Sequence, residues 1–316
     1  MGFNWVKQKL GIESDEKKMK IALALSGGAA LGLSHIGSLK AFEEAGIYPS
    51  VISGTSAGAI IGGMYCSGMD IKEIEEIALS VDRIKTINLF TPTIQRGALI
   101  KDDNILKFFR KYFGDKKIED LEMPFVAVSV DINTGEIVYI NEGSLVGAVR
   151  ASISIPGIFP PLISKDRLLV DGGIRSNLPL EVLKAYNPDK IVGINVLKNS
   201  RFKMNSCYDT IELNSLENNE KDNNIIEKIS NVMQGKSQNK IQFPPLVKSV
   251  FNSLQILLAE SSQREIEIVN PDLVINVDVS AFRLWEFWEA EKMIDIGYHA
   301  TQEVLTNNEK INKLVN

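Results

Sequence analysis

The chain has 316 residues, 44% of them hydrophobic and 24% charged, and its formal net charge is −5. This composition is that of an ordinary globular protein, and it excludes the basic footprint of a nucleic-acid-binding protein. Two cysteines, Cys66 and Cys207, are too few for a disulfide framework or a cysteine metal site.

The N-terminal segment, residues 1–20, carries charges throughout and lacks the apolar core of a secretory signal, which predicts a cytoplasmic location. Residues 1–10 mix aromatic side chains with lysines, as an interfacial anchor does. A short helix docked on the domain is the alternative interpretation. We therefore expect an N-terminal extension over residues 1–19 and a single domain over residues 20–316.

Strand and helix patterns alternate along the rest of the chain. The predicted strands cover residues 21–25, 51–53, 125–131, 136–140, 168–170, 191–196 and 273–277. The predicted helices cover residues 33–45, 57–66, 71–79, 105–112, 145–151 and 246–266. This alternation predicts an α/β fold with a mostly parallel sheet covered by helices. The turn signal at residues 133–135 adds a local antiparallel pair.

Residues 45–69 carry no charged side chain and are numerous enough to cross a bilayer. Glycines and a proline interrupt this stretch repeatedly. The pattern therefore favours a strand, a turn and a closely packed buried helix over a membrane-spanning helix.

Ser56 lies at the centre of Gly54-Thr55-Ser56-Ala57-Gly58, between a predicted strand and a predicted helix. A G-x-S-x-G pattern at such a junction is typical of a nucleophile elbow, in which a tight backbone bend exposes the serine hydroxyl. The alternative interpretation is an ordinary turn, because small residues and serine are also frequent in turns.

A glycine-containing loop, Ser26-Gly27-Gly28-Ala29-Ala30-Leu31-Gly32, follows the first predicted strand. Such a loop before a helix leaves backbone N–H groups free to bind a negative charge. The loop matches neither the dinucleotide fingerprint nor the P-loop. With a candidate nucleophile nearby, it favours an oxyanion hole, although a loop that serves only helix–sheet packing remains the alternative.

Three residues are candidates for the base that activates Ser56. His35 falls in the helix after the glycine loop, where packing is its expected role. His299 falls in a C-terminal amphipathic pattern, and with Ser56 it would satisfy the chain order of an α/β-hydrolase. Asp171 ends a short apolar strand and precedes Gly172 and Gly173, which places a carboxylate where ligands commonly bind in α/β sheets.

Four ordered blocks resemble the patatin-like phospholipase family: residues 26–37 (SGGAALGLSHIG), 54–58 (GTSAG), 151–161 (ASISIPGIFPP) and 171–179 (DGGIRSNLP). The resemblance implies a three-layer α/β/α fold and a serine acyl hydrolase that acts on lipid or other acyl esters without metal or cofactor. It further implies a Ser56–Asp171 dyad without a catalytic histidine. Peripheral membrane contact is an expectation from the interfacial pattern of residues 1–10 and from the aromatic side chains of residues 281–288. The oxyanion would be bound by backbone N–H groups of Gly27, Gly28 and Ala29. The glycines that support these motifs would be Gly32, Gly54, Gly58, Gly172 and Gly173.

The loop departs from the family pattern at two positions. Ala29 replaces the third glycine, and Leu31 replaces a basic residue. The loss of a cation beside the oxyanion site has three interpretations: lower activity, a changed head-group preference, or a lipid-binding relative that is not catalytic.

Three further segments bear on access to the site. Residues 197–243 form a polar excursion, either a lid or a surface insertion. Residues 281–288 contain four aromatic side chains, which suit core packing or docking to a lipid interface. Residues 152–161 are apolar and stiffened by prolines, so we expect them to form one wall of a groove that leads to Ser56.

Overall fold

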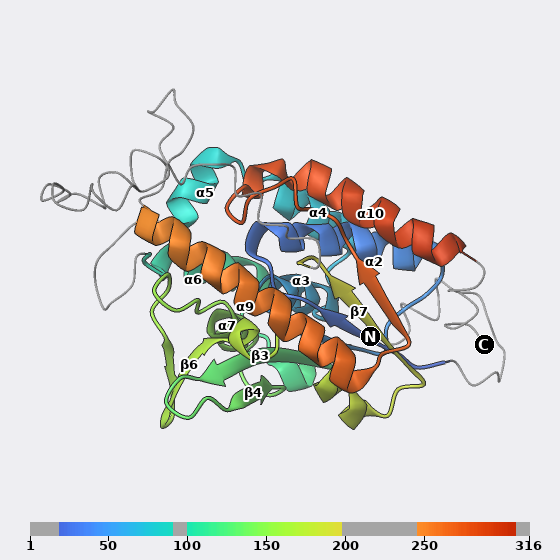
Figure 1. Cartoon of the computed structure of the whole chain (residues 1–316), viewed down its shortest axis with the longest axis horizontal. Helices are drawn as coiled ribbons and strands as arrows, with labels where there is room; N and C mark the ends of the chain where they lie inside the picture. Colours follow the sequence, from blue (N-terminus) through green and yellow to red (C-terminus); the bar gives the residue numbers. More distant parts are fainter. Residues whose placement is uncertain (1–18, 91–99, 198–244, 308–316) are drawn as a thin grey trace, which may run out of the picture.

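The computed structural model describes residues 19–90, 100–197 and 245–307 (Figure 1). The N-terminal extension, except its last residue, and almost all of the polar excursion lie outside the described residues. No helix within the three described ranges combines the length and hydropathy needed to span a bilayer.

The centre of the fold is an eight-stranded sheet with the order β5-β6-β3-β2-β1-β7-β8, and β4 also pairs with β3. The pairs β1–β2, β1–β7, β2–β3 and β7–β8 are parallel, whereas β3–β4, β3–β6 and β5–β6 are antiparallel. The strands are β1 (Ile21–Leu25), β2 (Val51–Thr55), β3 (Phe125–Asp131), β4 (Ile137–Ile140), β5 (Leu162–Ser164), β6 (Arg167–Asp171), β7 (Lys190–Asn195) and β8 (Leu273–Asn276).

The first strand shows how the sheet separates two cores. Successive side chains of a strand point to opposite faces. Ile21, Leu23 and Leu25 accordingly belong to the main hydrophobic core, and Ala22 and Ala24 belong to a smaller one. The two faces of the sheet are therefore both covered, which gives the three layers expected of an α/β/α fold.

Helices form the two outer layers. They are α2 (Ser34–Glu44), α3 (Ala57–Cys66), α4 (Ile71–Leu79), α5 (Arg83–Leu89), α6 (Asp103–Phe113), α7 (Leu145–Ser152), α9 (Pro245–Val269) and α10 (Ala290–Thr306). Buried side chains of α2, α3, α4, α6, α7 and α10 make up much of the main core. The smaller core is closed by the 3-10 helix η5 (Glu181–Tyr186) and the C-terminal end of α9. Figure 1 shows α9 running diagonally across the molecule, with α2 and α10 side by side.

The structure confirms the mostly parallel sheet, and it confirms the uncharged stretch as strand β2 followed by helix α3. It differs from the expectation in having three antiparallel pairs instead of one. Strand β5 and helix α5 were not predicted. Both are short, and β5 is largely exposed, so neither has the apolar periodicity that marks the longer elements.

Candidate active site

Ser56 occupies a strained bend between β2 and α3. Its φ is 54° and its ψ is −117°, outside the regions that non-glycine residues normally adopt, at a cost on the order of 1–3 kcal/mol. The N–H of Ser56 donates to the Ser152 hydroxyl at 2.9 Å, and that hydroxyl donates to the Val128 carbonyl at 2.6 Å. Ser152, the last residue of α7, thus ties the bend to strand β3.

The glycines on either side of Ser56 have no room for a side chain. A Cβ at Gly54 would lie 2.4 Å from the Gly58 carbonyl oxygen, and a Cβ at Gly58 would lie 2.2 Å from the Leu25 carbonyl oxygen. Helix α3 therefore begins in direct contact with the ends of β1 and β2, as a close strand-to-helix turn requires.

Asp171 is brought to Ser56 by the register of three strands. Thr55 of β2 pairs with Val128 of β3, and Asp171 of β6 pairs with the next residue of β3, Ser129. Ser56 directly follows Thr55, so Ser56 and Asp171 lie close together on either side of β3. Strand β6 is antiparallel to β3, unlike the parallel strands on which the sequence prediction relied. The Asp171 carboxylate nevertheless lies at the edge of the sheet where β2 ends, because Ser129, the partner of Asp171, lies near the middle of β3.

Asp171 is 4% exposed, so its carboxylate is buried. Its Oδ1 accepts a hydrogen bond from the Gly173 N–H at 2.8 Å. Burial raises the pKa of Asp171 to about 6, although the Gly173 N–H and the neighbouring Ser56 side chain act in the opposite direction. A carboxylate with such a pKa is a stronger base than an ordinary aspartate and is mostly ionised at neutral pH.

The glycine loop lies beside Ser56. A Cβ at Gly27 would lie 3.3 Å from the Ser56 Cβ. The N–H of Gly27 donates to the Asn177 carbonyl at 2.9 Å, whereas within the described residues the N–H groups of Gly28 and Ala29 donate to no acceptor. Gly27 thus differs from its expected role, because its N–H already has a partner. Gly28 and Ala29 remain the candidate oxyanion donors.

The two departures of the loop have different structural consequences. Ala29 has a φ of 48°, so it adopts the left-handed conformation that favours glycine at a cost of roughly 1–2 kcal/mol. Leu31 is 2% exposed and belongs to the main hydrophobic core. Its side chain therefore contributes to packing, although its Cβ lies 3.6 Å from where a Cβ at Gly28 would be, so position 31 does adjoin the loop.

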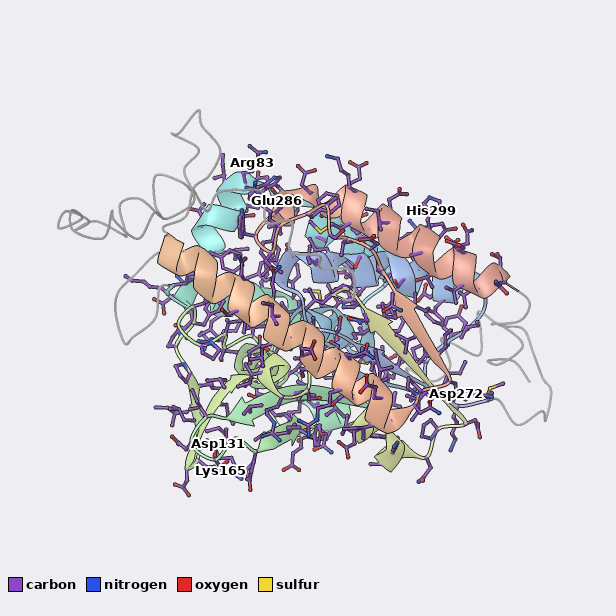
Figure 2. The ribbon with its side chains drawn as sticks, viewed as in Figure 1. Arg83, Asp131, Lys165, Asp272, Glu286 and His299 are labelled. Atoms are coloured by element: carbon purple, nitrogen blue, oxygen red, sulfur yellow. The ribbon has the colours of Figure 1, made fainter. Side chains whose placement is uncertain are left out.

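Neither histidine is hydrogen-bonded to Ser56. His35 is fully buried, its Nε2 hydrogen-bonds the Ser26 carbonyl at 2.8 Å, and burial lowers its pKa to about 4. His299 lies on the outer side of α10 (Figure 2), where its side chain is 64% exposed and its Nε2 is 3.3 Å from Asp295. The geometry therefore gives no support to an α/β-hydrolase triad of Ser56 with His299.

An apolar cavity of about 130 Å³ reaches Ser56. Its walls come from α3, α4, α5 and α6, from the segment after α7, and from the 3-10 helix η7 (Phe287–Glu289). Ser56 is the one residue with a polar side chain among the described residues that line it. The cavity thus joins a hydroxyl to a surface of hydrocarbon, which suits an ester whose acyl part is apolar.

The segment after α7 is a wall of this cavity, as predicted, through Ile153, Ile155 and Phe159. It is held by Arg150, which is 1% exposed and donates to Asp102, to the Ser154 hydroxyl and to the Pro160 carbonyl. Because Asp102 precedes α6, Arg150 links two walls of the cavity.

The aromatic segment 281–288 contributes to both the core and the cavity. Phe282, Trp285 and Phe287 pack against the main core, and Phe287 also lines the cavity. Arg83 of α5 stacks over Trp288, with 4.9 Å between its guanidinium carbon and the ring centroid.

No group of three or more histidine, cysteine, aspartate or glutamate side chains in the described part of the chain could hold a metal ion.

The model of the family described as patatin-like phospholipase matches residues 23–184. The chain belongs to this family. The matched region begins in β1 and ends in η5, so it contains the glycine loop, the Ser56 bend and Asp171.

Relatives of this patatin-like chain include bacterial and animal proteins. An uncharacterised NTE family protein of Mycobacterium bovis is 35% identical over 177 residues, which cover 56% of this chain and 49% of that protein. The patatin-like phospholipase domain-containing protein 6 of mouse is 28% identical over 308 residues, which cover 93% of this chain and 21% of that protein. The chain therefore spans about half the length of the mycobacterial relative, and less of the mouse protein. Among solved structures, VipD from Legionella pneumophila has a TM-score of 0.44 at 15% identity, covering 90% of this chain and 66% of that one.

Several residues of this site had no signal in the sequence. The apolar faces of α4 and α6 have the same periodicity whether they face a core or a cavity, so Ile74 and Phe109 could be assigned only to packing. Ser152 and Asn177 lie within the recognised blocks, but their contacts depend on how distant segments meet.

Proposed function

We propose that this chain is a serine acyl hydrolase that cleaves carboxylic esters of lipids through a Ser56–Asp171 dyad. The observation that carries the proposal is the closeness of the buried Asp171 to Ser56, which lies in a strained bend and lines an apolar cavity. Membership of the patatin-like phospholipase family supports the same reaction class.

In the first half of the reaction, Asp171 accepts the proton of the Ser56 hydroxyl while Oγ attacks the ester carbonyl carbon. The tetrahedral intermediate collapses, the ester C–O bond breaks, and the alcohol leaves with the proton. In the second half, Asp171 removes a proton from water, whose oxygen attacks the acyl-enzyme. The fatty acid leaves and Ser56 regains its proton.

The developing oxyanion would be bound by the N–H groups of Gly28 and Ala29. Both lie where the 3-10 helix η1 (Ala29–Leu33) begins, and neither is used by another acceptor among the described residues. Donors that are already oriented stabilise the transition state more than the neutral ester, and removing one such donor typically costs about 10²–10³ in rate.

Covalent labelling tests the nucleophile. A fluorophosphonate should add to wild type once, as measured by intact mass, and should not add to Ser56→Ala. Ser80→Ala, a change at an exposed serine outside the site, is the control and should be labelled like wild type. Folded wild type that gains no adduct would instead favour a lipid-binding protein without catalysis.

The apolar cavity predicts a dependence on acyl length. A cavity of comparable size, about 150 Å³, holds a benzene ring in another protein, so this one has room for a short acyl chain. Each buried methylene contributes about 0.8 kcal/mol, which corresponds to roughly a fourfold rise in kcat/KM. We expect kcat/KM on p-nitrophenyl esters to rise steeply with chain length and then level off.

Phe159→Ala should move that plateau to longer chains, because it enlarges one wall of the cavity. Phe42→Ala is the matched control, since Phe42 is equally buried but does not line the cavity. A flat response to chain length in wild type would contradict the acyl site and the lipid assignment with it.

Peripheral contact with a lipid surface is a further part of the proposal. Helix α5 lines the cavity through Leu89 and exposes 70% of Ile84, flanked by Arg83 and Lys85. Such a helix would place the cavity beside the membrane that supplies the ester. Cosedimentation with anionic phospholipid vesicles measures this contact. Equal pelleting of wild type and Ile84→Asp would contradict the proposal that α5 contacts the membrane.

A further inference from the structure

Helix α9 lies outside the region matched by the family model, yet one of its faces is polar and buried. Ser261, Ser262 and Glu265 are 8%, 0% and 6% exposed. Ser262 and Ser261 lie three and four positions before Glu265, and residues at these spacings share a face of a helix, so these side chains lie on the face of Glu265. That face contacts the segment that follows Asp171, residues 173–180.

The serines of this face hold Asn177. The backbone N–H of Asn177 donates to the Ser261 hydroxyl oxygen at 3.0 Å, and its side-chain amide donates to the Ser262 hydroxyl oxygen at 2.8 Å. Ser262 in turn donates to the Leu258 carbonyl within α9. Asn177 is itself fully buried, so its polar groups depend on these partners.

Glu265 holds the same segment at two points, Ser176 and Leu180. One carboxylate oxygen accepts from the Ser176 hydroxyl, and the other accepts from the Leu180 N–H at 2.8 Å. In the described residues no lysine or arginine forms an ion pair with Glu265, and burial raises its pKa to about 7. An acid buried without a cation costs folding free energy, which the contacts with Ser176 and Leu180 only partly offset.

The segment held by α9 touches every part of the proposed dyad site. The Asn177 carbonyl accepts from the Gly27 N–H at 2.9 Å, next to the candidate oxyanion donors. The Ser176 carbonyl accepts from the Thr55 hydroxyl at 2.8 Å, next to Ser56. Gly173, at the start of the segment, donates its N–H to Asp171.

We propose that Glu265 is a positioning residue, which acts through Ser176, Asn177 and Leu180 to fix Asp171 relative to Ser56 and the glycine loop. This inference rests on the proposed ester hydrolysis for its kinetic consequence, but the positioning itself can be measured without activity. Helix α9 therefore helps to position the site, although it begins more than seventy residues after Asp171 in the sequence.

The kinetic test compares Glu265→Gln with Glu267→Gln, a matched change at an exposed residue of the same helix. In Glu265→Gln one carboxylate oxygen becomes an NH2 group, which donates and cannot accept, so the variant loses the charge and the hydrogen bond that Glu265 now accepts from the Ser176 hydroxyl must reverse its direction. We expect kcat on a p-nitrophenyl ester to fall about 10- to 100-fold with KM within twofold, while Glu267→Gln matches wild type. A change confined to KM, or no change in kcat, would contradict the proposal.

Hydrogen–deuterium exchange separates this inference from the proposed function. In Glu265→Gln, peptides that contain residues 26–28 and 172–180 should exchange faster than in wild type, with peptides from α2 and α10 unchanged. If wild type proved inactive, the same measurement would still decide the positioning role. Unchanged exchange in both peptides would overturn it, and uniformly faster exchange would show a general loss of stability instead.

Discussion

Ser56→Ala and Asp171→Asn should each lower kcat/KM on an ester substrate by more than about 10³-fold, with His299→Ala within twofold of wild type. Ser56→Ala removes the nucleophile. Asp171→Asn retains a side chain of the same size but cannot accept the Ser56 proton. His299 is an exposed residue of α10, so its removal leaves the site unchanged.

Steady-state kinetics with matched circular dichroism spectra would measure these effects. The double variant Ser56→Ala/Asp171→Asn should be about as inactive as either single variant, because the two groups act as a unit. A folded His299→Ala enzyme with a large loss of kcat would transfer the role of base to that histidine and revive the α/β-hydrolase interpretation.

The pH dependence should identify Asp171 as the titrating base. Its pKa is raised to about 6, so kcat/KM should rise with pH through about 6 and level off above about 7. At pH 4 roughly one carboxylate in a hundred would be ionised, which predicts about a 100-fold loss. Initial rates between pH 4 and 9 on a substrate without ionisable groups would measure this, and a midpoint near 4 would contradict a base with a raised pKa.

The same shift has a consequence for stability. Because the pKa of Asp171 is higher in the folded state than the ordinary 3.8, the folded chain binds more protons, and stability from this group is lost as pH rises through 6. Asp171→Asn cannot ionise. It should therefore be more stable than wild type at pH 8, by on the order of 3 kcal/mol, and similar to wild type below pH 4.

Denaturant unfolding of both proteins at pH 8 and pH 4 would test this difference. His35 and Glu265 also have shifted pKa values, but both are present in each protein, so the comparison isolates Asp171. An inactive Asp171→Asn variant with no gain in stability at pH 8 would mean that burial of the charge is offset by its hydrogen bonds.

Local patterns in the sequence determined the secondary structure around the site. The apolar run of β1, the run of small residues in α3 and the G-x-S-x-G bend are each read from neighbouring residues, because side-chain direction in a strand or helix depends on short periods. The alternation of these patterns predicted the α/β fold, and the resemblance of the four ordered blocks implied its three layers. Asp171 was a candidate base from its position at a strand end, and the resemblance then favoured it over His35 and His299 as the partner of Ser56.

The tertiary structure decided everything that depends on register and packing between distant segments. Only the pairing of β3 with both β2 and β6 places Asp171 beside Ser56. The direction of Leu31 into the core followed from how η1 packs, which no local period encodes. Glu265 was read from the sequence as part of an apolar helix, because its partners Ser176 and Leu180 are more than eighty residues away along the chain. A hydrogen bond between residues so far apart in the sequence produces no periodic pattern from which it could be predicted.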